Sequence, residues 1–440
     1  MIVKNVVVLG GGFAGLAAAV KLTELGHSVT LVERRRQLGG RAFSFTDPTT
    51  GDTVDNGQHL FMKCYHATLA LLQSLGAHDE VEFQNEFQIE FRHPQKGTST
   101  LRIAKTLPRP LNVLAGFLRF KSIGLSDVLK LRNIKPELSK QLPLSLSVAQ
   151  WLEQCKQTQR LQENFWNPLC LAALNEPTSQ ASARYMQAVL REGFFGSPDG
   201  AFLGYSRLGL SNLLSARSQT FLNKHEQKLL LGLSAKRIDS VSTHEIAVHL
   251  SDNTKLTPDA IICAIPPQAL SSLLTPHSFP ELLQKLSLYR PSPILSVNLW
   301  YDRPCLDVPF IGMLGTQMEW AFNKHHLYQT HDHASPGHIT LLASAAHALS
   351  QSQPKDLIEL AQQEFESVAP SASEANLQHA RVICERKATQ TLPLGESPPN
   401  THTNHPKLLL AGDWVNTGLP ATIESAVRSG FCAANSVDKK

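Results

Sequence analysis

Three glycines near the start of the chain, Gly10, Gly12 and Gly15, have the G-x-G-x-x-G spacing of a turn that binds phosphate groups. The apolar residues 6–9 precede them, and a stretch rich in Ala and Leu follows. In a strand-to-helix turn of this kind, the first glycine allows the sharp bend and the second allows close approach of a pyrophosphate. The third allows the helix to pack on the strand. The pattern predicts a dinucleotide-binding site.

Three further residues extend this site. Phe13 and Ala14 open the predicted helix, whose first N–H groups and partial positive charge attract phosphate. Glu33 closes the next apolar run, eighteen residues beyond Gly15. An acid at that position accepts hydrogen bonds from the ribose hydroxyls of an adenosine. We therefore expect Phe13, Ala14 and Glu33 to bind the same cofactor as the glycines.

The residues after Glu33 indicate which dinucleotide is bound. Arg34 follows it directly, and a second glycine pair ends in Gly40 and Arg41. A fold that binds only a nicotinamide cofactor has no need of this extension. Gly40 allows the backbone to approach the cofactor closely, and Arg41 can face its phosphates. Arg34, Gly40 and Arg41 are therefore predicted cofactor-binding residues.

A second buried strand near the end of the chain leads into Gly412 and Asp413. Asp413 is placed to bind hydroxyl or amide groups in the middle of the cofactor. Pro420 suits the first turn of a helix, and the free N–H groups of Ala421 and Thr422 would face the pyrimidine edge of a flavin. Such a positive helix end stabilises an anionic reduced flavin. The two ends of the chain together predict one FAD site.

Residues 55–59, Asp-Asn-Gly-Gln-His, supply polar groups that we expect beside the flavin. Gly57 allows the backbone to approach, while Gln58 and His59 can lie near the reacting ring. His59 is a candidate proton donor, because the pKa of an unperturbed histidine is close to neutrality. A structural histidine that is hydrogen-bonded within a turn explains the same residue equally well.

The elements that must position these residues follow a Rossmann-type order. Residues 4–9 predict a buried strand, 13–25 an apolar helix and 28–33 a second strand, which form a βαβ unit and imply a parallel sheet. The remaining periodicity predicts helices at 66–75, 147–154, 159–174, 181–191, 210–222 and 355–368, and strands at 237–250, 260–264, 293–301, 309–314, 319–323, 339–345 and 380–387.

The fold class is therefore α/β: a Rossmann-like FAD-binding domain of the glutathione-reductase kind with an interleaved α+β substrate domain. At 440 residues the chain exceeds the usual size of a single domain. We assign residues 1–90, 205–272 and 400–440 to the FAD-binding domain. Residues 91–204 and 273–399 then form the substrate domain.

Composition narrows the class of protein. Charged residues make up 18% of the chain, which is low and indicates extra apolar surface for a ligand, a partner or a membrane. The seven cysteines are scattered without a CxxC pair, which indicates a reduced, cytoplasmic compartment. No stretch reaches the ~18 uninterrupted apolar residues of a membrane span, so any membrane contact would be peripheral.

The basic segment, residues 92–140, carries eleven Lys and Arg residues against Asp127 and Glu137, whereas the whole chain has a net charge of +4. Leucines and phenylalanines are interleaved with these charges at helical spacing. A helix lying on anionic lipid at the inner face of the cytoplasmic membrane explains this pattern. A solvated basic face over an ordinary core helix explains it equally well. Nucleic acid is a poorer partner, because no binding motif accompanies the charge.

The histidine-rich segment, residues 324–338, contains five histidines. Such spacing can bind a metal ion, but its polar, loop-like neighbours favour an exposed hairpin tip. We predict no metal site. No serine or cysteine nucleophile motif occurs in the chain either.

Together these motifs resemble those of the hydroxysqualene dehydroxylases, also called squalene-associated FAD-dependent desaturases. That family lies within the amine oxidase and phytoene desaturase superfamily of FAD proteins, and the resemblance spans essentially the whole chain. The glycine fingerprint and residues 411–424 are shared by the superfamily and identify only FAD. Residues 55–59 and the segment FWNPLCLAALN at 165–175 are more selective. The resemblance also places Ala235 beside the adenine, where the superfamily often has a valine.

The resemblance implies a reaction: hydroxysqualene is reduced to squalene by reduced FAD, in bacterial squalene and hopanoid biosynthesis. It also implies two partners, a long apolar isoprenoid substrate and a reductant for FAD. The chain has no second glycine fingerprint for a nicotinamide cofactor, so the reductant is not identified. His59 is then the candidate acid that protonates the leaving hydroxyl.

Two alternatives remain at this point. A carotenoid-type phytoene desaturase would transfer electrons in the other direction, from a polyprene to the flavin. A non-catalytic prenyl binder, similar to the Rab escort and dissociation-inhibitor proteins, would share the fold without holding flavin. The intact residues Gly10, Gly12, Gly15, Glu33 and Asp413 argue against the second alternative.

Overall fold

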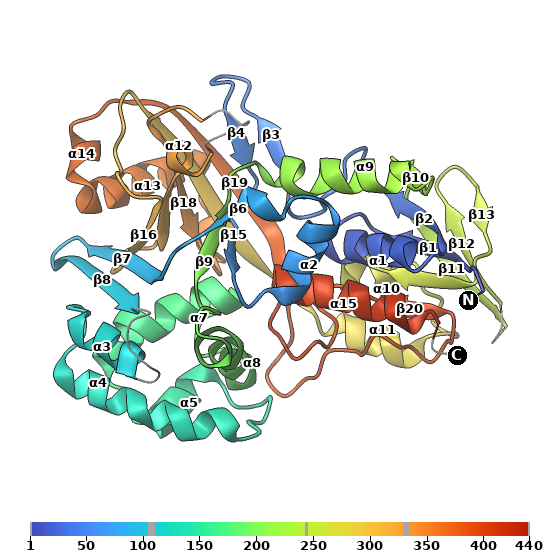
Figure 1. Ribbon diagram of the computed structural model, residues 1–440, viewed down its shortest axis with the longest axis horizontal. Coiled ribbons are helices and arrows are strands. Elements are labelled where there is room, and N and C mark those ends of the chain that lie inside the picture. The colour runs from blue at the N-terminus through green and yellow to red at the C-terminus, as the bar shows by residue number, and fades with distance from the viewer. Residues whose placement is uncertain (1, 104–110, 243–244, 329–333, 439–440) are drawn as a thin grey trace.

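The computed structural model describes residues 2–103, 111–242, 245–328 and 334–438. Figure 1 shows an elongated molecule with a parallel sheet toward one end and a large mixed sheet toward the other. Both chain termini lie at the end that holds the parallel sheet (Figure 1). This arrangement confirms the predicted α/β class, with a Rossmann-like part and an α+β part.

The parallel sheet has the strand order β10-β2-β1-β14-β20, and every neighbouring pair in it is parallel. Val6 and Val8 of β1 pack into the core on one face, whereas Val7 and Leu9 pack into the core on the other. The strand is apolar without interruption because both of its faces are buried. The five strands are β1 (Asn5–Leu9), β2 (Ser28–Glu33), β10 (Lys228–Leu231), β14 (Ala260–Cys263) and β20 (Leu408–Leu410).

Different elements cover the two faces of this sheet. One face carries α1 (Phe13–Glu24), α15 (Ile423–Ser436), α2 (His66–Ser74) and α9 (Ala216–Lys224). The other face carries a small antiparallel sheet and two short helices: β11 (Ala235–Ser242), β12 (Glu245–Leu250), β13 (Lys255–Leu256), α10 (Pro267–Ser271) and α11 (Pro280–Ser287).

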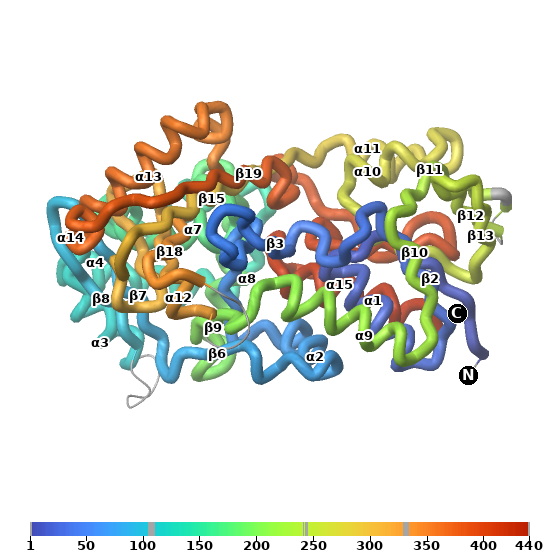
Figure 2. Tube along the Cα trace, turned by 90° about the horizontal axis from the view of Figure 1, so that it is seen from above, coloured from blue at the N-terminus to red at the C-terminus, as the bar shows by residue number. Residues whose placement is uncertain are grey.

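The mixed sheet has the order β19-β15-β18-β17-β16-β7-β8, in which β16 and β7 alone pair in parallel. One of its faces packs on α13 (Pro354–Val368) and α14 (Pro370–Ser373), and Figure 2 shows α13 beside β15 and β19. The strands are β7 (Phe87–His93), β8 (Gly97–Ile103), β15 (Arg290–Tyr301), β16 (Phe310–Met313), β17 (Trp320–Asn323), β18 (His338–Ala343) and β19 (Leu377–Thr391).

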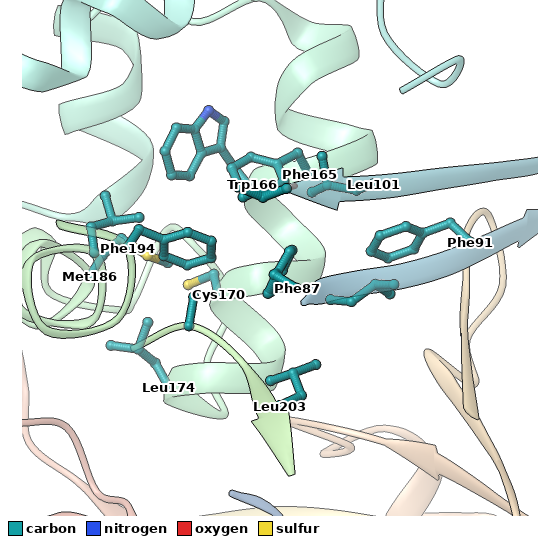
Figure 3. Packing of buried hydrophobic residues seen from close by; sticks show 14 of the residues in the cluster. Phe87, Phe91, Leu101, Phe165, Trp166, Cys170, Leu174, Met186, Phe194 and Leu203 are labelled. Atoms are coloured by element: carbon teal, nitrogen blue, oxygen red, sulfur yellow. The ribbon is translucent and has the colours of Figure 1, made fainter. Parts of the chain in front are cut away.

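A layer of helices packs on the other side of the mixed sheet around a core rich in aromatic residues, part of which is drawn in Figure 3. Three of its segments are π-helical or 3-10 turns rather than α-helix. The layer consists of α3 (Leu111–Arg119), α4 (Leu125–Leu131), η2 (Arg132–Ser139), α5 (Val148–Gln154), α6 (Gln159–Leu161), η3 (Gln162–Trp166), α7 (Asn167–Leu174), α8 (Ala183–Val189) and η4 (Leu190–Gly196).

Small elements connect the two parts. The hairpin of β3 (Ser44–Thr46) and β4 (Thr53–Asp55) is fixed to the mixed sheet, because Trp300 donates an indole hydrogen bond of 2.6 Å to Asp52. The remaining elements are β5 (Leu60–Met62), β6 (Val81–Phe83), β9 (Leu203–Ser206), η1 (His78–Glu80), η5 (Ser211–Ser215), α12 (Lys324–Leu327) and η6 (Leu349–Gln351).

The structure differs from the predicted elements at several places. The last helix begins at Ile423 with Thr422 as its N-cap, so Pro420 precedes the helix and does not lie in its first turn. The hairpin β7–β8 and the edge strand β10 were not predicted. Strand β7 begins at Phe87, four residues before the predicted start of the substrate domain at residue 91. The full set of domain ranges stays a prediction.

Candidate active site

The turn between β1 and α1 has the geometry that a phosphate-binding turn requires. Gly10 has a φ of +103°, and a Cβ atom on Gly15 would lie 1.8 Å from the carbonyl oxygen of Gly10. No side chain caps the N-terminus of α1 at Gly12, so Phe13 and Ala14 begin a helix whose first N–H groups have no side-chain acceptor. This is the cradle that the glycine spacing predicts.

Glu33 lies directly beside this turn at the end of β2. Its carboxylate accepts hydrogen bonds from the backbone N–H groups of Gly11, at 2.7 Å, and Arg35, at 2.9 Å. The residue is only 7% exposed, and each of its oxygens keeps a second lone pair for a ribose hydroxyl. The position of Arg34 is different, because its side chain is exposed on the loop after β2.

Ala235 lies at the first position of β11, two residues after a backbone contact with Glu33. The backbone N–H of Leu233, two residues earlier, donates to the carbonyl oxygen of Glu33 at 3.2 Å. Ala235 itself is half-buried and packs against the core beneath the parallel sheet. The contact of Leu233 with Glu33 thus brings the start of β11 near the end of β2.

Gly40 and Arg41 connect the two ends of the chain. A Cβ atom on Gly40 would lie 2.9 Å from the Cα atom of Gly12, so the second glycine pair passes against the first turn. The Arg41 guanidinium lies 2.6 Å from the carboxylate of Asp413 and donates to the carbonyl oxygen of Ala388 at 2.7 Å. Burial opposes the charge of Arg41, but the neighbouring Asp413 outweighs it and raises the pKa of the guanidinium.

Residues 412–422 form the part of the predicted site that comes from the C-terminal end of the chain. Gly412 has a φ of +146°, and its N–H donates to the hydroxyl of Ser429 at 2.7 Å. Pro420 is buried, Ala421 is half-buried, and the hydroxyl of Thr422 accepts the N–H of Ser425 at 3.2 Å as the N-cap of α15. The helix end that we expect to face a flavin is therefore present, although it begins later than predicted.

His59 lies in the loop after β4, with its ring half-buried. Nδ1 lies 2.9 Å from the carbonyl oxygen of Gly57, and because a carbonyl only accepts, Nδ1–H is the donor. Burial lowers the pKa of His59; Asp55 opposes this change, while Arg41 and Lys324 add to it. A Cβ atom on Gly57 would meet no atom within 4 Å, so this segment borders open space.

Three residues beside His59 were not predicted to belong to the site: Lys324, Asp55 and Tyr328. The side chain of Lys324 is 1% exposed and donates hydrogen bonds to Asp55, Gln58 and the hydroxyl of Tyr328. Asp55 had been noted only as part of the motif at 55–59. A lysine directly after the buried strand β17 was the available signal, because a cation there must find an internal partner.

The prediction of an exposed hairpin tip at 324–338 is wrong for Lys324 and for His338, which are both buried. Lys324 opens the short helix α12, and His338 is completely buried in β18, where its ring stacks on Trp300 at 4.2 Å between ring centroids. His325 is exposed, as expected. Residues 329–333 lie outside the described part of the chain. Within that part no group of three or more metal-ligating side chains is found.

The selective segment 165–175 belongs to the aromatic-rich core beside the mixed sheet. Figure 3 shows Phe165, Trp166, Cys170 and Leu174 directed into one packed cluster. Asn175 ends α7 with a φ of 52° and its amide donates to the hydroxyl of Thr389 on β19 at 2.8 Å. These residues shape the interior rather than offer reactive groups.

The site residues fit FAD on structural grounds. Gly10 and Gly15 lie where a Cβ atom would overlap backbone atoms, so the turn from β1 into α1 stays tight. The start of α1 offers N–H groups without a side-chain cap, and a buried carboxylate stands at the end of β2. The ion pair of Arg41 and Asp413 joins the second glycine pair to the segment that leads into α15.

Comparison with known proteins agrees with this geometry. The family described as flavin containing amine oxidoreductase matches residues 13–438. Three relatives named hydroxysqualene dehydroxylase match, among them one from Sinorhizobium fredii that is 27% identical over 98% of this chain and 98% of its own length. The 15-cis-phytoene desaturase of Narcissus pseudonarcissus is 24% identical over 98% of this chain and 79% of its own length.

The fold has solved counterparts. A putrescine oxidase structure superposes with a TM-score of 0.76 at 16% identity and covers 100% of both chains. The predicted resemblance and the predicted cofactor are thereby confirmed. No support is left for a non-catalytic prenyl binder, and the protein is an FAD-dependent oxidoreductase. The chain belongs to the flavin-containing amine oxidoreductase family.

Proposed function

We propose that the protein reduces hydroxysqualene to squalene in bacterial squalene and hopanoid biosynthesis. The observation that carries this proposal is the match over full length: the chain spans 98% of a hydroxysqualene dehydroxylase but 79% of a phytoene desaturase. The selective segments 55–59 and 165–175 support it, because the first carries His59 on a segment that borders open space and the second contributes apolar side chains to the interior. A phytoene-type desaturase is the second candidate.

The reaction balances as a hydride substitution. The allylic C–O bond of the substrate breaks, a C–H bond forms at the same carbon, and the hydroxyl leaves as water after it has gained a proton. When bound, reduced FAD supplies the hydride and becomes oxidised. The protein must therefore supply an acid for the leaving hydroxyl and an apolar enclosure that keeps water from the allylic cation.

We assign the acid to His59. Its Nδ1–H is committed to the carbonyl oxygen of Gly57, so a neutral ring has no proton on Nε2 to give. The acid form therefore requires a second proton at Nε2. Because burial lowers the pKa of His59 below its ordinary value, that form becomes populated only at a lower pH than for an ordinary histidine.

This assignment predicts the pH dependence of turnover. We expect kcat to rise as the pH falls through the His59 pKa and to decline steadily above it, because only the protonated ring donates. His59→Gln should retain bound flavin and lose most of the turnover, by roughly 100-fold or more. Normal turnover by His59→Gln with FAD bound would contradict the assignment.

Product analysis tests the reaction itself. Purified holoenzyme is reduced under anaerobic conditions and incubated with hydroxysqualene, and in a parallel sample oxidised holoenzyme is incubated with phytoene. We expect squalene and reoxidised flavin in the first sample and unchanged phytoene in the second. Desaturated phytoene without any squalene would favour the second candidate instead. The proposed reaction also needs a partner that donates electrons to FAD in the cell, and this reductant is not identified.

We also propose peripheral contact with an anionic membrane through α3 and α4. Among the described residues, five of the eight exposed large apolar side chains lie on these two helices. Leu111, Leu114 and Leu118 follow one face of α3 at i, i+3 and i+7, and are 53%, 43% and 52% exposed. On the neighbouring helix α4, Leu125 and Leu129 are 66% and 55% exposed, and we call these five side chains together the leucine face.

Charge around the leucine face favours lipid over a neutral partner. The opposite face of α3 packs on β8 through Asn112, Gly116 and Phe117. Five basic side chains are exposed beside the leucines, each worth about 1 kcal/mol near an anionic surface: Arg119, Lys121, Lys130, Arg132 and Lys135. Lys105 and Arg109 lie outside the described residues. No described helix is long and apolar enough to cross a bilayer.

Vesicle binding tests this surface. We expect the double variant Leu118→Glu/Leu125→Glu to lose binding to phosphatidylglycerol vesicles by roughly tenfold or more, because it removes apolar insertion and adds repulsion. Val3→Glu is the matched control: it changes an equally exposed apolar residue at the opposite end of the molecule (Figure 1). Equal binding by both variants and the unchanged protein would refute the membrane contact.

A further inference from the structure

Lys324 has an unusual environment for a lysine. It follows β17 as the first residue of α12, and its side chain is 1% exposed. The acceptors of its ammonium group among the described residues include Asp55 at 3.2 Å, Gln58 at 2.6 Å and the hydroxyl of Tyr328 at 2.7 Å. Its charge is therefore compensated inside the protein, because the side chain has almost no exposure to solvent.

The counter-charge is held just as firmly. One carboxylate oxygen of Asp55 accepts the hydroxyl of Ser44 at 2.7 Å and the N–H of Leu210 at 3.1 Å. The other oxygen accepts the hydroxyl of Tyr328 and faces Lys324. Burial alone would raise the pKa of Asp55, but Lys324 and these hydrogen bonds outweigh it and lower the pKa. The pair is therefore ionised.

This pair acts directly on the segment that carries His59. Because Lys324 occupies the amide oxygen of Gln58, the amide nitrogen of Gln58 is turned toward the carbonyl oxygen of His59, at 3.3 Å. The two residues that border the open space at Gly57 thus take their orientation from a side chain 266 residues away in the sequence.

We propose that Lys324 is a positioning residue for the acid of the proposed reaction: its ammonium group, anchored by Asp55, fixes the Gln58–His59 segment and sets the electrostatic potential at the His59 ring. The inference rests on the proposed role of His59. It does not depend on hydroxysqualene being the substrate.

A purely structural role explains the cluster less well. A buried ion pair is often no more stabilising than apolar residues of the same volume, so packing alone does not account for two charges here. The charged groups that face His59 are Asp55 on β4, Lys324 on α12 and Arg41 on the loop after β2. Lys324 also faces the buried ring of His338. The Lys324–Asp55 pair thus contributes one positive and one negative charge beside His59, and each can be removed by a single substitution.

The test measures the titration of His59 by NMR in holoenzyme with ¹³C-labelled histidine, assigned by comparison with His59→Gln. Lys324→Met removes the positive charge, so we expect the titration midpoint of His59 to rise. Asp55→Asn removes the negative charge, so we expect it to fall. The double variant Lys324→Met/Asp55→Asn keeps the site neutral, and its midpoint should lie above that of Asp55→Asn.

Lys63→Met is the matched control. Lys63 lies four residues beyond His59 but pairs with Asp199 at the surface, and its removal should leave the midpoint unchanged. If Lys324→Met does not fold, the His59 midpoint of the double variant is compared with that of Asp55→Asn, and this difference still tests the effect of Lys324. Midpoints that stay equal across folded variants would overturn the inference. Failure of the acid assignment is a separate result, normal turnover by His59→Gln, and leaves this titration readable.

Discussion

At the scale of single residues, two glycines of the site carry different constraints. A Cβ atom on Gly15 would overlap the carbonyl oxygen of Gly10 at 1.8 Å, whereas one on Gly57 would meet nothing within 4 Å. We expect Gly15→Ala to destabilise the apoprotein and abolish FAD binding. Gly57→Ala should fold normally, at a cost below about 1 kcal/mol, yet bind FAD on the order of tenfold more weakly, about 1.4 kcal/mol, if cofactor approaches this backbone.

Thermal unfolding of both apoproteins and flavin fluorescence titration separate these effects. Gly57→Ala thereby serves as the folded counterpart of Gly15→Ala. FAD affinity that is unchanged in Gly57→Ala would remove Gly57 from the predicted cofactor contacts without affecting the glycine turn.

The same scale shows what residue type and spacing can predict. Gly10, Gly15 and Glu33 were identified because a phosphate turn and a ribose impose residue types at fixed intervals. Lys324 was missed because its partners, Asp55 and Gln58, come from a segment far away in the sequence. The position of Lys324 directly after a predicted strand indicated that it needs an internal partner, but no local pattern identifies that partner.

At the scale of elements, Glu424 connects two helices that cover the parallel sheet. It lies in the first turn of α15, is 1% exposed, and accepts the N–H groups of Ala67 and Thr68 at the start of α2, at 3.0 and 2.9 Å. We expect Glu424→Ala to destabilise the protein by about 2–4 kcal/mol, because it leaves these buried donors unpaired. Chemical denaturation of the apoprotein measures this loss.

A second acid provides the comparison. Arg428 contacts both Glu424, at 2.8 Å, and Glu192, at 2.9 Å, but the Glu192 side chain is 40% exposed. Glu192→Ala should cost less than about 1 kcal/mol, since exposed ion pairs contribute little. Similar losses in the two variants would show that the contact with Arg428, and not the cap of α2, is what Glu424 contributes.

Elements with local signals were predicted closely, and elements that depend on distant partners were not. The βαβ unit observed at Asn5–Leu9, Phe13–Glu24 and Ser28–Glu33 agrees with its predicted ranges within one residue, because apolar periodicity and glycine turns define it locally. Hairpin β7–β8 is polar at alternate positions and is stabilised by pairing with β16, more than 200 residues later. Its strand character comes from the assembled sheet.

At the scale of the whole molecule, the two ends of the chain build one site because they pack on each other throughout. Helices α1 and α15 cross so closely that a Cβ atom on Gly430 would lie 2.2 Å from the carbonyl oxygen of Ala14. Strands β1 and β20 flank β14 in the same sheet. The cofactor end of the molecule thus closes only when the last residues of the chain have folded.

The pair of Arg41 and Asp413 is the polar counterpart of this packing, joining residues 372 positions apart. Asp413 is 7% exposed as a side chain and Arg41 33%, so removal of either partner leaves a partly buried charge unpaired. We expect Arg41→Gln and Asp413→Asn each to lower the stability of the apoprotein by roughly 1–3 kcal/mol.

A double-mutant cycle tests whether the pair couples the two ends. Because the second substitution removes a charge that is already unpaired, the double variant should lose less than the sum of the singles, by about 1 kcal/mol or more. Lys21 and Glu24, both about a third exposed on one helix, form the control pair, with an expected coupling below about 0.5 kcal/mol. Strictly additive losses for Arg41 and Asp413 would mean that apolar packing of α1 on α15, and not this ion pair, holds the two ends together.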